Sequence, residues 1–315
     1  MSRVVVAGGA GFLGSHLCDH LIGRGDSVIC LDDLSTGSRD NVAHLRDNEH
    51  FTLVVTDVSE KVELEGSAHI DAVCNLASPA SPPAYLRRPL ATLAVGSEGT
   101  RRLLELAREH KARFLMASTS EIYGDPEVHP QIESYRGNVD STGPRSVYDE
   151  AKRFSESLTM AMHREYDVNV GIARIFNTYG PRLAPGDGRV VSNFIVQALR
   201  GDPLTVYGDG SQTRSLCYVD DEIAGLVALL DSSLTGPVNV GNPDERTVLE
   251  LAQVVLEVSG SRSSIVYEAL PTDDPTRRCP DITLATEQLG WSPSTELRDG
   301  IARTIEYLAT KVVGP

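Results

Sequence analysis

A tyrosine and a lysine, Tyr148 and Lys152, lie four residues apart in the segment YDEAK. Residues at this spacing share one face of a helix, so the ammonium group lies near the phenol. A phenol with an ordinary pKa of about 10 is a poor base at neutral pH, and a nearby ammonium stabilises its phenolate. The pair therefore predicts a tyrosine base that removes a proton from a substrate hydroxyl group.

A group of hydroxyl side chains precedes this pair, where the apolar run RFLMA ends in Ser118, Thr119 and Ser120. A side chain at the carboxyl end of a strand in an open α/β sheet points into the crevice where ligands bind. We therefore expect the hydroxyl of Thr119 to hold the same substrate oxygen that Tyr148 deprotonates.

A glycine-rich turn follows the first apolar run, VVVA, and opens a helix. Without side chains its backbone amides can approach a pyrophosphate, and the helix N-terminus attracts an anion. The strand before the turn, the helix after it and Asp32 at the end of the second strand together predict a dinucleotide site. A carboxylate at Asp32 accepts the ribose hydroxyls of NAD and repels the extra phosphate of NADP, so NAD is the predicted cofactor. Within the turn, the expected contacts to NAD are Gly8, Gly11, Phe12, Leu13 and Gly14.

These groups need a frame of strands that end at one edge of a sheet. Short β-branched runs alternate with amphipathic stretches, including helices expected at 91–110 and 147–166. This rhythm predicts an α/β fold with a Rossmann-type doubly wound parallel sheet. It weakens near residue 180, where loops rich in Gly, Pro and Asp begin. We therefore predict an NAD-binding domain over 1–180 and a smaller carboxy-terminal α/β lobe over 181–315 that binds substrate and is interleaved with the first.

Composition narrows the classes of partner. The chain has 315 residues and a formal net charge of -15, which argues against nucleic acid and anionic membranes. It contains no apolar run long enough to span a bilayer and starts without a secretory signal pattern, so a cytoplasmic location is predicted. The cysteines and histidines lack metal-ligand spacing, and no metal is expected.

Beyond this physical reasoning, the residues resemble a known family. The turn, Thr119 and the Tyr148/Lys152 pair are similar to the extended short-chain dehydrogenases/reductases that act on nucleotide sugars. More narrowly, four segments resemble the UDP-glucuronate decarboxylases, also called UDP-xylose synthases. These segments are 76–83 (LASPASPP), 118–126 (STSEIYGDP), 174–182 (RIFNTYGPR) and 187–194 (DGRVVSNF).

The resemblance implies a role for each matching residue. Thr119, Tyr148 and Lys152 would oxidise C4 of the sugar, and Ser120 and Glu121 would act near C5 and the carboxylate. Asp57 and Ala77 would join the cofactor site, and Tyr148 and Lys152 would also contact the cofactor. Contacts to a nucleotide sugar, with UDP-glucuronate as the expected substrate, would come from Asn177, Arg182, Arg189, Val190, Tyr207, Arg214 and Arg278.

Position 120 separates the possible reactions. The similar 4,6-dehydratases have an Asp there, which protonates a departing hydroxyl, whereas this chain has Ser120. A 4-keto glucuronate is a β-keto acid that loses carbon dioxide with less assistance. Decarboxylation to UDP-xylose, with the hydride returned to C4, is therefore the first hypothesis. C4 epimerisation of UDP-glucuronate or another UDP-sugar is the alternative, ahead of 4,6-dehydration or an NAD-binding protein without catalysis.

The chain departs from the family pattern at two positions, with Gly96 where Asn is usual and Ala151 where Gly is usual. The first departure is expected to alter the local geometry of the nicotinamide pocket, and the second is expected to be tolerated. The family also implies a homodimer, in which the helices at 91–110 and 147–166 pair with their copies in a four-helix bundle.

Overall fold

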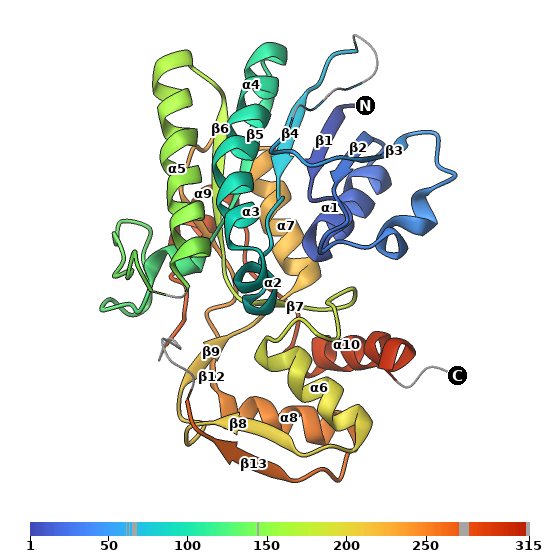
Figure 1. Ribbon diagram of the computed structural model, residues 1–315, viewed down its shortest axis with the longest axis vertical. Helices are drawn as coiled ribbons and strands as arrows, with labels where there is room; N and C mark the ends of the chain where they lie inside the picture. The colour runs from blue at the N-terminus through green and yellow to red at the C-terminus, as the bar shows by residue number, and fades with distance from the viewer. Residues whose placement is uncertain (61, 63, 65–67, 144, 271–276, 313–315) are drawn as a thin grey trace.

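The computed structural model describes residues 1–60, 62, 64, 68–143, 145–270 and 277–312. Within these residues, seven parallel strands form the central sheet, in the order β11-β6-β5-β4-β1-β2-β3 (Figure 1). The order reverses between β1 and β4, which is where doubly wound sheets bind dinucleotides. The strands are β1 (Arg3–Ala7), β2 (Ser27–Asp32), β3 (Phe51–Val55), β4 (Ala72–Asn75), β5 (Arg113–Thr119), β6 (Val170–Ile175) and β11 (Val238–Val240).

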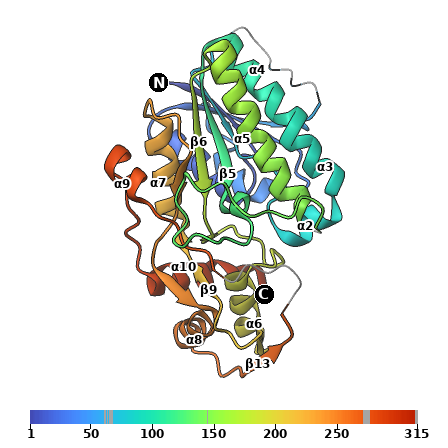
Figure 2. The ribbon, with the colours of Figure 1, turned by 90° about the vertical axis from the view of Figure 1, so that its left-hand side faces the viewer.

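Helices cover both faces of the sheet, as Figure 2 shows with α7 on one side and α4 and α5 on the other. Both faces are buried, so the strands are nearly continuous apolar runs, such as Val4, Val5 and Val6. The helices of this lobe are α1 (Phe12–Gly23), α2 (Pro82–Arg87), α3 (Pro89–Ala94), α4 (Thr100–His110), α5 (Ser146–Tyr166), α7 (Val219–Leu230) and α9 (Thr283–Leu289). Shorter turns are η1 (Arg39–Leu45), η2 (Val95–Gly99) and η3 (Ser120–Tyr123).

The helix expected at 91–110 is interrupted by the π-turn η2. Two glycines, Gly96 and Gly99, lie in this turn and have low helix propensity. Ser155 of α5 donates a hydrogen bond to the carbonyl oxygen of Gly96 at 2.6 Å. A contact from the neighbouring helix therefore supports the irregular turn that separates α3 from α4.

A smaller lobe lies beyond the carboxyl ends of the central strands. Its helices are α6 (Val190–Arg200), α8 (Val248–Ser259) and α10 (Leu297–Val312). Its short strands pair as β7 (Thr178–Tyr179) with β10 (Cys217–Tyr218), β8 (Leu204–Tyr207) with β13 (Ile265–Glu268), and β9 (Thr213–Ser215) with β12 (Glu245–Thr247). The division between residues 180 and 181 stays a prediction: β7 lies just before it, and β11, α7 and α9, which follow it in the chain, pack with the larger lobe.

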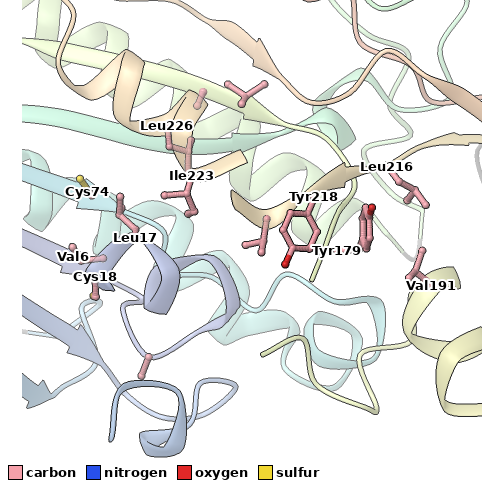
Figure 3. Packing of buried hydrophobic residues seen from close by; sticks show 14 of the residues in the cluster. Val6, Leu17, Cys18, Cys74, Tyr179, Val191, Leu216, Tyr218, Ile223 and Leu226 are labelled. Atoms are coloured by element: carbon pink, nitrogen blue, oxygen red, sulfur yellow. The ribbon is translucent and has the colours of Figure 1, made fainter. Parts of the chain in front are cut away.

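One apolar core joins the two lobes. It starts between the sheet and helices α1 and α7, where Leu17 and Leu226 are fully buried. Figure 3 shows the same cluster continuing through Tyr179 and Tyr218 to Val191 at the start of α6. The lobes are therefore packed together as one body, and the space between them has fixed walls. None of the helices in the described part of the chain has the length and apolar character needed to cross a bilayer.

Candidate active site

A cleft of about 880 Å³ lies between the lobes, at the carboxyl ends of the central strands. Its walls include every residue that the sequence singles out for the cofactor, the chemistry or the substrate. The structure therefore brings these positions together in one place, while their individual roles stay predictions. Among the described residues, no three His, Cys, Asp or Glu side chains gather in a way that would hold a metal ion.

The glycine turn forms one end of the cleft. Gly8 has a φ of +77°, and a Cβ atom there would lie 2.7 Å from the backbone of Leu76. A Cβ atom on Gly14 would lie 2.0 Å from the carbonyl oxygen of Gly8, so the helix and the turn meet without room for a side chain. Helix α1 begins at Phe12, and no side chain caps it. Its first amides therefore remain available to an anion such as a pyrophosphate.

Asp32 lies at the end of β2, beside the turn. Its carboxylate accepts hydrogen bonds from the amides of Ala10, at 3.0 Å, and Leu34, at 2.8 Å. Burial raises the pKa of Asp32 above its ordinary value, against these hydrogen bonds. Asp57 also lines the cleft, and its Oδ1 accepts from the amide and hydroxyl of Ser59 at 2.8 and 2.7 Å. Both carboxylates are thus held by hydrogen bonds at the wall of the cleft, and their contacts to ribose and adenine stay predictions.

The proposed base lies at the centre of the cleft. Tyr148 and Lys152 come from the first turns of α5, and the Nζ atom of Lys152 is 5.9 Å from the centroid of the Tyr148 ring. Lys152 also donates a hydrogen bond to the carbonyl oxygen of Ala117 at 2.8 Å. The Thr119 hydroxyl lies near the phenol and acts to lower the pKa of Tyr148. Strand β5 and helix α5 therefore place the three predicted catalytic groups side by side.

Burial controls the protonation of this pair. It raises the pKa of Tyr148 above its ordinary value, although the Thr119 hydroxyl opposes the shift. It lowers the pKa of Lys152 from 10.5 to about 8. The phenol therefore keeps its proton at neutral pH until positive charge enters the cleft, whereas the lysine remains mostly an ammonium ion there.

An ionised carboxylate lies beside this pair. Glu121 accepts hydrogen bonds from Arg145 at 2.7 Å and from Arg278 at 3.4 Å. Burial raises the pKa of Glu121, but the charges of Arg278 and Arg145 outweigh it and hold the pKa below its ordinary value. Arg278 is only 1% exposed and donates a second hydrogen bond to the carbonyl oxygen of Ser120. The cluster therefore offers guanidinium groups to an acidic substrate.

The smaller lobe supplies the opposite wall. Arg189 precedes α6 and donates to both carboxylate oxygens of Asp187, at 2.5 and 2.9 Å. No side chain caps α6, so its N-terminus, beginning at Val190, is a second place for phosphate oxygens. Arg182 has one nitrogen bound to Asp19 of α1 at 2.6 Å. The remaining predicted contacts, all on the cleft wall, are Asn177, Tyr207 and Arg214.

Comparison with known proteins decides the family. A model described as the NAD-dependent epimerase/dehydratase family matches residues 4–241. The chain belongs to the NAD-dependent epimerase/dehydratase family. Its curated relatives include UDP-glucuronic acid decarboxylase 1 of Arabidopsis thaliana, 51% identical over 311 residues, which are 99% of this chain and 71% of that protein. The Danio rerio protein of the same name is 49% identical over 310 residues, covering 98% of this chain and 73% of that one.

Solved structures of the epimerase/dehydratase family have the same fold. UDP-glucose 4-epimerase from Thermotoga maritima, solved with UDP-glucose, matches with a TM-score of 0.88 at 28% identity over 98% of this chain and 99% of that one. UDP-glucuronic acid 4-epimerase from Bacillus cereus, solved with UDP-glucuronic acid and NAD, matches with a TM-score of 0.86 at 27% identity and the same coverage. These likenesses confirm the predicted Rossmann-type architecture.

NAD, the dinucleotide of the epimerase/dehydratase family, fits the residues present. The turn has no room for side chains at Gly8 and Gly14, the start of α1 is uncapped, and Asp32 stands where a second phosphate would be repelled. The predicted NAD cofactor thus agrees with the family, and the turn has the shape that a dinucleotide pyrophosphate requires.

Three residues of the site were missed by sequence reasoning. Arg145 lies three residues before Tyr148 and binds Glu121. Its position one helical turn from the tyrosine is a local signal that could have indicated it. Tyr85 lies two residues beyond the segment LASPASPP and stacks on Tyr148. Lys311 of α10 lines the cleft near Asp40 of η1, with 3.9 Å between Nζ and Oδ2. Nothing local marks Lys311, because only the packing of the lobes brings it there.

Proposed function

We propose that this protein is a UDP-glucuronate decarboxylase, which converts UDP-glucuronate into UDP-xylose and carbon dioxide. Close relatives with this name cover almost the whole chain, and the predicted reaction agrees with them. The proposal rests on the side chains of the two residues that follow Thr119, which are Ser120 and Glu121. Ser120 has a hydroxyl where a dehydratase needs an acid, and Glu121 is held as a carboxylate by two arginines. Neither side chain is suited to protonate a departing hydroxyl group.

Different residues of the cleft act in different steps of the reaction. Tyr148, assisted by the charge of Lys152, takes the proton from the C4 hydroxyl, which Thr119 orients. When bound, NAD would supply the oxidant for C4 and, once reduced, the hydride that C4 takes back. With C4 as a ketone, the C5–C6 bond breaks, carbon dioxide leaves, and the electron pair of that bond forms an enolate. The protonated phenol of Tyr148 hydrogen-bonds the enolate oxygen while C5 takes a proton from water, which restores the ketone. As hydride returns to C4, the phenol returns its proton to the C4 oxygen.

The arginines suit the acidic substrate. UDP-glucuronate carries a diphosphate and a carboxylate, and guanidinium groups match both geometries. Arg278 lies at the Glu121 end of the cleft, near Ser120, and Arg189 lies at the start of α6. We therefore place the carboxylate toward Arg278 and the diphosphate toward Arg189. Local positive charge of this kind is needed in a chain whose net charge is -15.

The experiment is to incubate purified protein with UDP-glucuronate and NAD, and to follow the nucleotide sugar by mass spectrometry. A product lighter by the mass of carbon dioxide establishes the decarboxylase. A product of unchanged mass with a new stereochemistry would establish the 4-epimerase, which the likeness to the UDP-glucuronic acid 4-epimerase keeps as the second candidate. The Tyr148→Phe variant serves as the inactive control.

We further propose that two copies associate through the helices predicted for the four-helix bundle, which are α3 with α4 and α5, and through the adjoining α2. Helix α5 lies at the left of Figure 1. The solvent-exposed apolar side chains of α2, α3 and α5 and their connections support this: Leu86 is 50% exposed, Leu90 80%, Leu93 39% and Phe154 51%. Apolar patches of this kind mark interfaces. Light scattering across micromolar concentrations should give twice the chain mass, and Leu90→Glu should give a monomer. A wild-type monomer would contradict the proposal.

We also propose a cytoplasmic location. The five cysteines are all free and buried, as expected where thiols stay reduced. Fractionation of the source cells tests this, because recovery of the protein from an oxidising compartment would contradict it.

A further inference from the structure

A second tyrosine lies flat against the proposed base. The rings of Tyr85 and Tyr148 are nearly parallel, with 7° between their planes and 5.2 Å between their centroids. This separation corresponds to an offset stack, the arrangement that aromatic pairs prefer. Tyr85 is only 2% exposed and Tyr148 is 6% exposed. One face of the Tyr148 ring is therefore covered by another ring.

The element that carries Tyr85 is short and held on several sides. Helix α2 begins with Pro82 and Pro83, which restrict its first turn, and packs against α3 and α5. A Cβ atom on Gly188 would lie 2.8 Å from the ring of Pro83, so α2 also touches the loop before Arg189. Tyr85 thus comes from a segment that contacts both the catalytic helix and the wall of the substrate lobe.

Tyr85 limits where the Tyr148 ring can move. Thr119 lies near the phenol hydroxyl, and Lys152 lies 5.9 Å from the ring centroid. Rotation of the ring about its long axis leaves the phenol oxygen in place, but a swing of the whole ring would carry that oxygen out of hydrogen-bond distance of the substrate hydroxyl. A flat neighbour that is itself buried blocks this swing on one side and keeps water away from the ring face.

We propose that Tyr85 is a positioning residue for the reaction, whose ring keeps the Tyr148 ring from swinging toward α2 and shields the phenol from water. This proposal rests on the assignment of Tyr148 as the base. It leaves open which nucleotide sugar is the substrate, since the stack acts on the enzyme's own side chain. Tyr85 contributes shape and a dry surface, and both persist if its hydroxyl is removed.

The test compares Tyr85→Phe, which keeps the ring, with Tyr85→Leu, which removes it. With UDP-glucuronate, Tyr85→Phe should keep kcat within about twofold, whereas Tyr85→Leu should lower kcat by about 10- to 100-fold, the range expected for a misplaced reacting group. KM should change much less than kcat in both. Tyr135→Leu is a matched control, because it removes a similar stack, with Tyr123, at 5.9 Å and 15°. It should leave kcat unchanged.

A second measurement needs no substrate. The phenolate absorbs in the ultraviolet, so the difference in titration between each NAD-loaded protein and its Tyr148→Phe counterpart isolates the ionisation of Tyr148. Because burial raises the pKa of Tyr148, Tyr85→Leu should move this ionisation to lower pH, and Tyr85→Phe should not. Equal losses of kcat in both variants, or an unmoved titration in Tyr85→Leu, would overturn the proposal. Failure of UDP-glucuronate to react would instead count against the proposed function, because the titration would still be informative.

Discussion

Gly96 lies so close to Ala151 that a Cβ atom added to Gly96 would stand 2.7 Å from the Cβ atom of Ala151. The contact joins the π-turn η2 to the catalytic helix α5, one residue before Lys152. These are also the two positions at which the chain departs from the family pattern. The two departures therefore compensate each other: Gly96 on η2 lacks a side chain, which leaves room for the methyl group of Ala151 on α5.

Gly96→Ala should destabilise the protein, because the new methyl group would overlap Ala151. Overpacking of this kind costs about 1–3 kcal/mol. Ala151→Gly should recover most of that loss when the two are combined, although alone it should destabilise the helix by up to about 1 kcal/mol. A double-mutant cycle by chemical denaturation measures the coupling.

Gly23→Ala is the matched control for that cycle. Gly23 ends α1, and a Cβ atom there would meet nothing within 4 Å. The substitution should therefore be neutral or stabilising, by up to about 1 kcal/mol. Additive effects of Gly96→Ala and Ala151→Gly would show that the two positions do not share one space.

Tyr148→Phe should abolish turnover while NAD remains bound. The variant loses only the hydroxyl group that takes the substrate proton, and the glycine turn and Asp32 are untouched. We expect kcat to fall by at least about 100-fold, with the cofactor content of the purified protein unchanged. Retained activity would exclude Tyr148 as the base, and lost NAD would point to a role in holding the cofactor.

Asp149 should make the protein less stable as the pH rises toward neutrality. Burial, with the charge of Glu121, raises the pKa of Asp149 from 3.8 to about 7, and its Oδ1 has no hydrogen-bond partner among the residues that the structure describes. The folded state therefore binds this proton more tightly than the unfolded state. The resulting stabilisation is complete below about pH 4 and is lost as the pH rises through about 7.

Asp149→Asn tests this, because an amide does not titrate. Relative to wild type, the variant should gain about 2–4 kcal/mol in unfolding free energy between pH 4 and pH 8. Urea denaturation at several pH values measures the gain. Glu150→Gln, at a neighbouring carboxylate that is 40% exposed, is the control and should show no such gain. A constant difference between wild type and Asp149→Asn would contradict the raised pKa.

Lys152 should set an alkaline limit to activity. Burial lowers its pKa to about 8, so above that pH the ammonium that assists Tyr148 is progressively lost. Lys152→Arg keeps a positive charge at every working pH. Its kcat should be lower than that of the wild type at neutral pH, and its profile should lack the fall near pH 8. The same fall in both proteins would assign that limit to another group.

Local patterns predicted much of this site because they lie at strand ends. The glycine turn follows β1, Asp32 ends β2 and Thr119 ends β5, so a parallel sheet brings them to one edge whatever the details of packing. Tyr148 and Lys152 are predicted from their helical spacing together with the glycine turn and the hydroxyl groups at the end of β5. Such patterns depend only on residues close together in sequence, and the structure places these residues on one cleft.

Contacts between residues far apart in the sequence could not be predicted from local patterns. The helix break at η2 depends on Ser155 of α5, and the stack on Tyr148 depends on how α2 packs. Glu121 stays ionised because the charge of Arg278 lowers its pKa, and Arg278 lies 157 residues further along the chain. Short-range pattern and propensity carry no information on which distant helix or arginine will be adjacent.

Helix α10 adds a constraint of a different kind. Tyr307 and Lys311 lie near the end of α10. They line the same cleft as Gly8, which lies in the turn after β1. Among the described elements α10 comes last in the chain, whereas the glycine turn follows the first strand. The part of the pocket wall that Tyr307 and Lys311 provide is therefore added last during synthesis.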